Sequence, residues 1–293
     1  MKVAILTQPL GHNYGGLLQA YALQHAILKL GADVVTVDRR KLDVKLTISE
    51  QLKIWVNDTI RLAKGKIKNR PSIHKVRYVL TNLHSFKANH IQISPEITKQ
   101  EELIEYFTQN PVDLLIVGSD QVWRPKYSPC IANYFFDFYS KIESSPKRIS
   151  YAASFGVDTW EFNEQDTRKC RSLISGFDAV SVREDSAIEL CKSYLNVDAV
   201  KVVDPTLLLE SSDYKALMPK SDVLGASGRV LNYILDPAKE KQDIAKKIAS
   251  LLSKESLTIK PDDYIKVKPK HIDKCIYPGV ELWLQSFFFV IMW

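Results

Sequence analysis

The residues best suited to chemistry follow apolar, strand-like runs of the chain. Asp120 stands in the polar segment GSDQVWR, directly after the apolar run 113–118. A carboxyl group in this position can serve as an acid, a base or an acceptor for a hydroxyl group. Trp123 follows three residues later, and its ring can stack on a sugar. The alternative is structural, with Asp120 as a helix N-cap and Trp123 in the core.

Arg183 is the second candidate. It ends the strand-like run 179–183 and precedes a helical segment. A guanidinium group in this position can bind a phosphate or a carboxylate through two parallel hydrogen bonds. The alternative is a surface ion pair between Arg183 and Glu184 or Asp185.

Two turns complete the set of candidates. The segment LGHNYGG, residues 10–16, lies between the first strand-like run and the first helical run. Its glycines let the backbone approach a ligand, and a helix N-terminus offers free N–H groups to an anion. Its spacing is not GxGxxG, so a dinucleotide site is not supported, and a tight turn is the alternative. Asp204-Pro205 ends a strand-like run and predicts either a turn or a ligand contact.

The elements that must position these residues alternate between strands and helices. Residues 2–7, a helix at about 17–30 and residues 33–38 form a βαβ pattern, which opens a parallel sheet. Further strands are predicted at 113–118, 148–154, 179–183 and 197–204, and further helices at 99–108, 164–174 and 185–194. Ligands of open parallel sheets bind at the carboxyl ends of the strands, so the polar clusters that directly follow the predicted strands are the favoured candidates.

The 293 residues suit about two domains. The first is predicted at 1–220, with a basic helical insertion at about 39–90. A polar linker at 211–227 leads to a strand at 229–235 and a helix at 237–253. Residues 225–293 are therefore expected to form a second α/β domain that is only partial, because about 70 residues are too few for a full Rossmann-like sheet.

Composition excludes several classes of protein. The apolar fraction of 45% and charged fraction of 25% are those of a soluble globular protein. The 4 Cys form no CxxC pair, so neither a zinc site nor a disulfide framework is indicated, and a reducing cytoplasm is expected. No apolar run reaches the ~20 residues that span a bilayer, and the N-terminus is interpreted as a strand rather than a signal peptide.

The positive charge is concentrated in one segment. Between Asp38 and Tyr78 there are 12 Lys or Arg against 4 Asp or Glu, whereas the whole chain has a net charge of +6. This distribution argues against a general nucleic-acid binder. An apolar helical stripe runs through the same segment, from Leu52 to Ile67. A solvated helix face is one interpretation, and contact with a membrane surface or a polyanion is the other.

Five segments in this order resemble the polysaccharide pyruvyl transferase family. They are GHNYGGLLQAYAL (11–23), DLLIVGSDQVWRP (113–125), RISYAASFG (148–156), VSVREDSA (180–187) and VVDPTLLL (202–209). The resemblance implies a GT-B-like fold of two Rossmann-like domains with parallel sheets and the active site in the cleft between them. It implies transfer of a pyruvyl group from phosphoenolpyruvate (PEP) to two hydroxyls of a sugar in a capsular or other surface polysaccharide.

The resemblance also implies roles for individual residues. Asp120 is the candidate catalytic residue and Arg183 the candidate anion clamp. The candidate substrate-binding residues are Asn13, Tyr14, Gly15, Gly118, Ser119, Gln121, Trp123, Arg183, Asp204 and Pro205. The implied partners are PEP as co-substrate and a lipid-linked or nucleotide-linked sugar acceptor. No metal, further cofactor or nucleic acid is expected, and the expected location is the cytoplasm, with peripheral contact at the inner membrane face.

The C-terminal segment departs from the family pattern. The resemblance implies a Ser-Phe-His-Gly-type motif after Trp283-Leu284, with a histidine as catalytic acid or PEP ligand. Here the last histidine is His271 and the tail reads SFFFVIMW, which would favour aggregation if exposed as a strand. A truncated or frameshifted gene product with impaired activity is therefore expected, with a natural short branch as the alternative. Two other functions remain open: a GT-B nucleotide-sugar glycosyltransferase and a non-catalytic carbohydrate-binding remnant.

Overall fold

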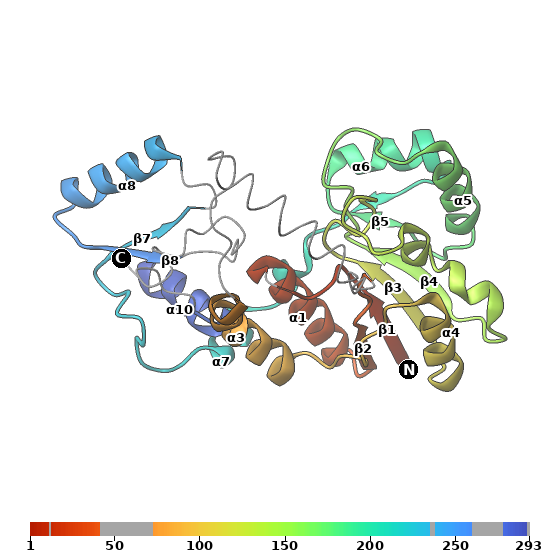
Figure 1. The fold of residues 1–293 in the computed structure, drawn as a ribbon, viewed down its shortest axis with the longest axis horizontal. Coiled ribbons are helices and arrows are strands. Elements are labelled where there is room, and N and C mark those ends of the chain that lie inside the picture. Colours follow the sequence, from red (N-terminus) through yellow and green to blue (C-terminus); the bar gives the residue numbers. More distant parts are fainter. Residues whose placement is uncertain (12, 42–72, 235–237, 260–277, 292–293) are drawn as a thin grey trace, which may run out of the picture. The chain divides into compact units, whose positions relative to one another are not determined.

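The computed structural model describes residues 1–11, 13–41, 73–234, 238–259 and 278–291 (Figure 1). The chain divides into two compact units. Among the described residues, unit 1 contains 1–11, 15–41 and 87–211, and unit 2 contains 13–14, 73–86 and 212–291. The apolar stripe from Leu52 to Ile67, in the predicted basic insertion, lies outside the described residues. The described end of that insertion forms helix α3, Ile73–His90.

Unit 1 is built on a parallel sheet. The strands β1 (Lys2–Leu6), β2 (Asp33–Val37), β3 (Leu114–Gly118) and β4 (Lys147–Tyr151) lie in the order β2-β1-β3-β4, and all their pairings are parallel. Two short strands, β5 (Ser181–Val182) and β6 (Val200–Lys201), also pair in parallel. Isolated parallel bridges from Ile149 to Ala179 and from Ala153 to Val182 continue this arrangement beyond β4. The predicted α/β class with parallel sheets is confirmed.

Both faces of the sheet are apolar, because alternate residues of a strand point to opposite sides. Val3 and Ile5 of β1 pack with Leu23 and Ile27 of α1, Tyr14–Lys29. Ala4 and Leu6 of the same strand belong to the cluster on the other side. The helices that contribute to this second cluster are α4 (Gln100–Gln109), α5 (Glu164–Ile174) and α6 (Asp185–Leu190).

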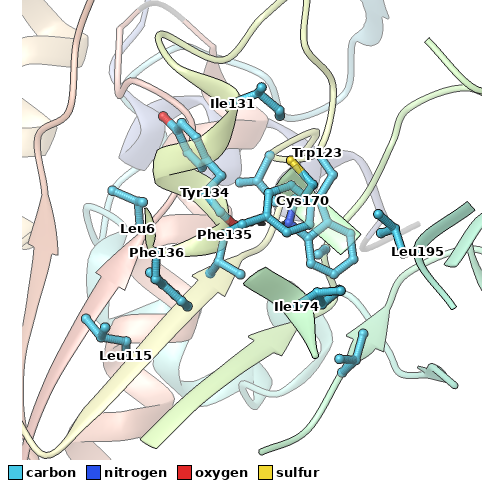
Figure 2. Close-up of a cluster of buried hydrophobic side chains, with 14 of the residues drawn as sticks. Leu6, Leu115, Trp123, Ile131, Tyr134, Phe135, Phe136, Cys170, Ile174 and Leu195 are labelled. Carbon is cyan, nitrogen blue, oxygen red and sulfur yellow. Dashed lines mark hydrogen bonds between the residues drawn. The ribbon is translucent and has the colours of Figure 1, made fainter. Parts of the chain in front are cut away.

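The second cluster is rich in aromatic side chains (Figure 2). Two 3₁₀ turns, Ile131–Phe135 and Asp137–Lys141, contribute Tyr134, Phe135, Phe138 and Tyr139 to it. Trp123 stacks on Phe135 with ring centroids 5.3 Å apart, and Figure 2 shows Cys170 and Ile174 of α5 close to them. Burial of rings of this size contributes strongly to stability.

The strand order reverses between β1 and β3. From β1 the chain continues to β2, which pairs with β1 along one of its edges. It later returns to β3, which pairs with β1 along the opposite edge. In open α/β sheets, ligands bind beyond the carboxyl ends of the strands at such a reversal. The segments that follow β1 and β3 are therefore the expected walls of a binding site.

Unit 2 contains a second βαβ element. Strands β7 (Val230–Tyr233) and β8 (Ser256–Ile259) pair in parallel and are joined through α8, Lys239–Leu251. This agrees with the strand and helix predicted at 229–235 and 237–253. Leu231, Tyr233, Leu257 and Ile259 form a small core with Trp283.

Two segments of unit 2 differ from expectation. The predicted linker 211–227 begins with a helix, α7 (Ser211–Leu217). The apolar tail is helical, because Val280–Ile291 form α10 rather than an exposed strand. The rings of Trp283 and Phe287 lie 5.0 Å apart, and both contact Tyr233. The apolar residues at the start of this tail are thus used in packing.

Candidate functional site

Asp120 lies in the loop after β3, with its backbone in the left-handed region at φ +66°. Its Oδ1 accepts a hydrogen bond of 2.8 Å from the backbone N–H of Gln121. Burial raises the pKa of the Asp120 carboxyl above its ordinary value. The hydrogen bond from Gln121 and the charge of Arg183 act against this rise in pKa, whereas the charge of Asp204 adds to it. Asp120 is therefore a carboxyl group that holds its proton more readily than an exposed aspartate.

Arg183 and Asp204 form an ion pair at the same edge. Nη1 of Arg183 lies 3.2 Å from Oδ2 of Asp204, and its Nε lies 3.5 Å from Oε2 of Glu184. The Arg183 side chain keeps 27% of its surface exposed, so the guanidinium remains accessible to a ligand. Asp120, Arg183 and Asp204 follow β3, β5 and β6, and the structure brings all three within range of mutual electrostatic interaction. The structure thus brings these three candidates together beyond the carboxyl ends of their strands.

The Asp204 carboxylate also accepts hydrogen bonds from Thr206 and Gln19. Its Oδ1 accepts hydrogen bonds from the backbone N–H of Thr206 at 3.0 Å and from the Thr206 hydroxyl at 2.8 Å. Its Oδ2 also accepts a hydrogen bond from the amide of Gln19 in α1. Asp204 thus caps the turn Pro205–Leu207 and pairs with Arg183 at once. Gln19 is not among the predicted site residues, although it lies in the segment 11–23 through which the chain resembles the family.

Glu184 connects the end of β4 with Arg183. The Ser154 hydroxyl donates a hydrogen bond of 2.6 Å to Oε1 of Glu184, and the backbone N–H of Phe155 donates one of 3.2 Å. The other carboxylate oxygen faces Arg183. The sequence indicates Glu184 only as an ion-pair partner of Arg183, and Ser154 is not among the predicted site residues. Glu184 directly follows the predicted strand 179–183, and Ser154 ends the predicted strand 148–154.

The loop after β3 is hydrogen-bonded to the loop after β1. Nε2 of Gln8 donates hydrogen bonds to the Gln121 carbonyl at 2.7 Å and to the Ser128 hydroxyl at 3.0 Å. The Gln121 side-chain carbonyl accepts a 3.1 Å hydrogen bond from Nη1 of Arg124. A Cβ on Gly156 would lie 2.2 Å from Oε1 of Gln121. The Gln121 side chain is therefore packed within the protein rather than extended toward solvent.

Gly118 and Ser119 sit where the loop leaves the sheet. Gly118 has φ +132°, and a Cβ there would lie 2.0 Å from the carbonyl oxygen of Tyr151, so only glycine fits. The Ser119 carbonyl accepts a hydrogen bond from the Thr7 hydroxyl at 3.3 Å. The Ser119 hydroxyl is buried, and no described residue serves as its hydrogen-bond partner.

The segments that carry Asp120, Arg183 and Asp204 all lie within the part of the chain that one family model matches. The family model for polysaccharide pyruvyl transferase matches residues 13–284. The chain is a member of the polysaccharide pyruvyl transferase family. No curated protein sequence matches the chain.

Solved structures that resemble this family member include α-glucosyltransferases. One, in complex with UDP, has 11% sequence identity and a TM-score of 0.49, and the match covers 96% of this chain and 67% of that chain. Another, in complex with UDP and a 13-mer DNA containing a central A:G mismatch, has 10% identity and a TM-score of 0.46. That match covers 96% of this chain, which spans only 64% of the length of the glucosyltransferase.

Three of the predicted substrate-binding residues are structural in this family member. The prediction that Trp123 stacks on a sugar is wrong, because its ring is fully buried and its Nε1 donates to the Tyr134 carbonyl at 3.1 Å. Tyr14 is buried in unit 2, where its hydroxyl donates to the Pro278 carbonyl at 2.7 Å and its ring stacks on Trp283. Pro205 is buried at the first position of the turn that Asp204 caps.

The remaining predicted residues of the first loop are exposed. Asn13 and Gly15 both lie at the surface, with Asn13 in unit 2 and Gly15 in unit 1. Within the described part of the chain, no group of three or more His, Cys, Asp or Glu is arranged to hold a metal ion. None of the described helices is long and apolar enough to cross a bilayer.

Proposed function

We propose that this family member binds PEP and transfers its pyruvyl group to two hydroxyls of a sugar in a capsular or other surface polysaccharide. The observation that carries the proposal is the meeting of Asp120, Arg183 and Asp204 beyond the carboxyl ends of the parallel strands β3, β5 and β6. They come from three separate segments through which the chain resembles the family. The reaction needs a cation for the anionic substrate and a group that can donate a proton, and these residues supply both.

Arg183 supplies the cation in this proposal. PEP carries a phosphate and a carboxylate, and a guanidinium binds either one through parallel hydrogen bonds. Because Arg183 is paired with Asp204 and Glu184, PEP has to compete with these carboxylates for its N–H groups.

Asp120 supplies the proton. Its raised pKa favours the protonated form, which can protonate the methylene carbon of PEP and leave C2 electrophilic. One sugar hydroxyl then attacks C2, and a second hydroxyl takes the place of the departing inorganic phosphate, which closes the cyclic ketal. The protons released by the two hydroxyls return to the Asp120 carboxylate and to the phosphate. PEP and a sugar diol thus become a ketal and inorganic phosphate, with no redox step.

The acceptor in this proposal is a lipid-linked or nucleotide-linked sugar, and the place of action is the cytoplasm. The resemblance also implies a histidine after Trp283-Leu284, and residues 1–293 contain no histidine after His271. We therefore expect residues 1–293 to bind PEP but to turn it over slowly or not at all. Binding and turnover have to be measured separately.

Equilibrium dialysis with labelled PEP tests the proposal. The full 293-residue chain should bind PEP, and unlabelled UDP-glucose should not displace it. Displacement by UDP-glucose, or binding of UDP-glucose in the absence of any PEP binding, would show a nucleotide-sugar glycosyltransferase instead. Carbohydrate binding without PEP binding would show a non-catalytic remnant. Rapid phosphate release from PEP with a sugar acceptor would disprove the expected impairment.

A further inference from the structure

Four hydrogen bonds from described residues reach the Asp204 carboxylate. Its Oδ1 accepts one from the backbone N–H of Thr206 and one from the Thr206 hydroxyl. Its Oδ2 accepts one from Nη1 of Arg183 at 3.2 Å and one from Nε2 of Gln19. Only 20% of the Asp204 side chain is exposed, so water can replace few of these donors. Because Gln19 and Arg183 donate to the same oxygen, the strength of each contact depends on the other.

The packing of α1 places Gln19 for this contact. The helix begins after the carboxyl end of β1 and runs back along the sheet, because β2 pairs with β1 in parallel. Leu23 and Ile27 of α1 belong to the core cluster on this face. Gln19 lies one turn before Leu23 on the same side of the helix, so it is the nearest of the three to the carboxyl ends of the strands. All of these residues, together with Arg183 and Asp204, belong to unit 1.

Asp204 is the fixed member of its ion pair with Arg183. Its side chain caps the turn Pro205–Leu207, and the Tyr151 hydroxyl donates a hydrogen bond of 3.2 Å to the carbonyl of Val203, directly before it. The long side chain of Arg183 is less constrained, since its Nη2 has no hydrogen-bond partner among the described residues. An anion that binds Nη1 and Nη2 together draws the guanidinium away from Asp204. The carboxylate then keeps three of its four hydrogen bonds.

We propose that Gln19 is a positioning residue that stabilises the Asp204 carboxylate when Arg183 turns to an anionic substrate. In the free protein Gln19 and Arg183 share Oδ2, and in the complex Gln19 is the donor that remains on this oxygen. Its hydrogen bond offsets part of the cost of leaving a mostly buried carboxylate without its cation. Gln19 thus favours the release of Arg183. The inference rests on the proposed function for the identity of the substrate, PEP, whereas the exchange itself needs only an anion at Arg183.

A double-mutant cycle on the full chain, measured by calorimetric titration, tests the proposal. Gln19→Leu removes the donor and nearly keeps the volume of the side chain. It should weaken PEP binding by about three- to tenfold, the equivalent of one net hydrogen bond. Asp204→Asn leaves no charge for Gln19 to stabilise. In that background Gln19→Leu should therefore change the affinity for PEP by less than about 1.5-fold.

The matched control is Gln109→Leu. Gln109 is also a glutamine in a helix of unit 1, and its Nε2 donates a hydrogen bond of 3.1 Å to a carboxylate oxygen, Oε1 of Glu105. This exposed pair lies in α4, and its loss should leave PEP affinity unchanged. Gln19→Ala is the second variant, because it removes the same donor without adding a branched side chain. It should weaken PEP binding as Gln19→Leu does, and urea unfolding should show all variants folded.

Inorganic phosphate as a second ligand separates this inference from the proposed function. If phosphate gives the expected cycle and PEP does not bind, the role of Gln19 is supported and PEP is not the substrate. If PEP binds but Gln19→Leu has no effect, or the same effect with and without the charge of Asp204, the positioning role is wrong and PEP binding stands. Binding of neither anion would disprove both.

Discussion

Nη1 of Arg183 lies 3.2 Å from Oδ2 of Asp204, so the cation at the end of β5 is already paired with the carboxylate that follows β6. Oε2 of Glu184 lies 3.5 Å from Nε of the same side chain. An anionic ligand of Arg183 has to share the guanidinium with these groups or displace them. The affinity of the site for an anion is therefore set by two carboxylates as well as by the arginine.

Replacing Asp204 with asparagine should strengthen anion binding. Asp204→Asn removes the charge that competes for Arg183 but keeps an acceptor for the N–H of Thr206. We expect PEP affinity to rise several-fold and the pKa of Asp120 to fall, because the charge of Asp204 raises that pKa. Calorimetric titration with PEP and carboxyl-carbon NMR measure the two effects.

The matched control is Asp185→Asn. Asp185 also pairs with a cation, since Nζ of Lys201 lies 2.6 Å from its Oδ2, but its side chain is 79% exposed. Exposed pairs contribute little, so this variant should leave PEP affinity unchanged. Equal changes in both variants would show a general charge effect rather than release of Arg183.

Asp120 should make the stability of the protein depend on pH. Its pKa is raised in the folded state, so its contribution to stability is fully present below the unfolded pKa and is lost as pH rises through the folded pKa. Asp120→Asn removes this loss and keeps both the acceptor for the Gln121 N–H and tolerance of a positive φ. The free energy of unfolding of the variant, minus that of the unaltered chain, should increase from about pH 4 to about pH 8. Urea unfolding across this range measures the difference, and a constant difference would contradict the raised pKa.

Trp123 should affect stability and not sugar binding. Trp123→Ala removes a fully buried ring that stacks on Phe135 and should lower the free energy of unfolding by about 3–5 kcal/mol. Tyr127→Ala, four residues later and 45% exposed, should cost no more than about 1 kcal/mol. Denaturant unfolding measures both. A Trp123→Ala variant of normal stability that has lost carbohydrate binding would restore the sugar-stacking role.

The loop that carries Asp120 depends on Gly118. Gly118→Ala would place a Cβ 2.0 Å from the backbone carbonyl of Tyr151, so the strand ends have to separate. We expect a loss of about 3 kcal/mol or more in the free energy of unfolding. Gly225→Ala is the control, because Gly225 also has a positive φ but no atom within 4 Å of the added Cβ, and it should cost about 1 kcal/mol. Similar losses for both variants would show that φ alone matters at Gly118.

The sequence predicted the strands of unit 1 well, because buried parallel strands such as 2–6 and 114–118 are continuous apolar runs. The strand predicted at 197–204 shortened to β6, whose two residues are exposed and pair only with β5. Asp120, Arg183 and Asp204 could be proposed from the sequence because each ends or follows a strand-like run, and their roles stay predictions. The prediction that Trp123 stacks on a sugar was wrong, because its polar sequence neighbours suggested an exposed loop whereas its ring lies in the core. The contact between Gln19 and Asp204 could not be predicted, because the two residues are far apart in the sequence, although Gln19 lies in the segment 11–23 that resembles the family.

The affinity of Arg183→Ala for PEP tests the proposed site most directly. Calorimetric titration of the full chain should show PEP binding, and Arg183→Ala should weaken it by about 10- to 100-fold, the cost of losing a charge-assisted hydrogen bond. Arg124→Ala is the matched control, because Arg124 is also paired with a carboxylate, with Nε 2.9 Å from Oε2 of Glu161, and it should change the affinity less than about threefold. PEP binding by Arg183→Ala as tight as that of the unaltered chain would contradict the assignment of Arg183 as the anion clamp.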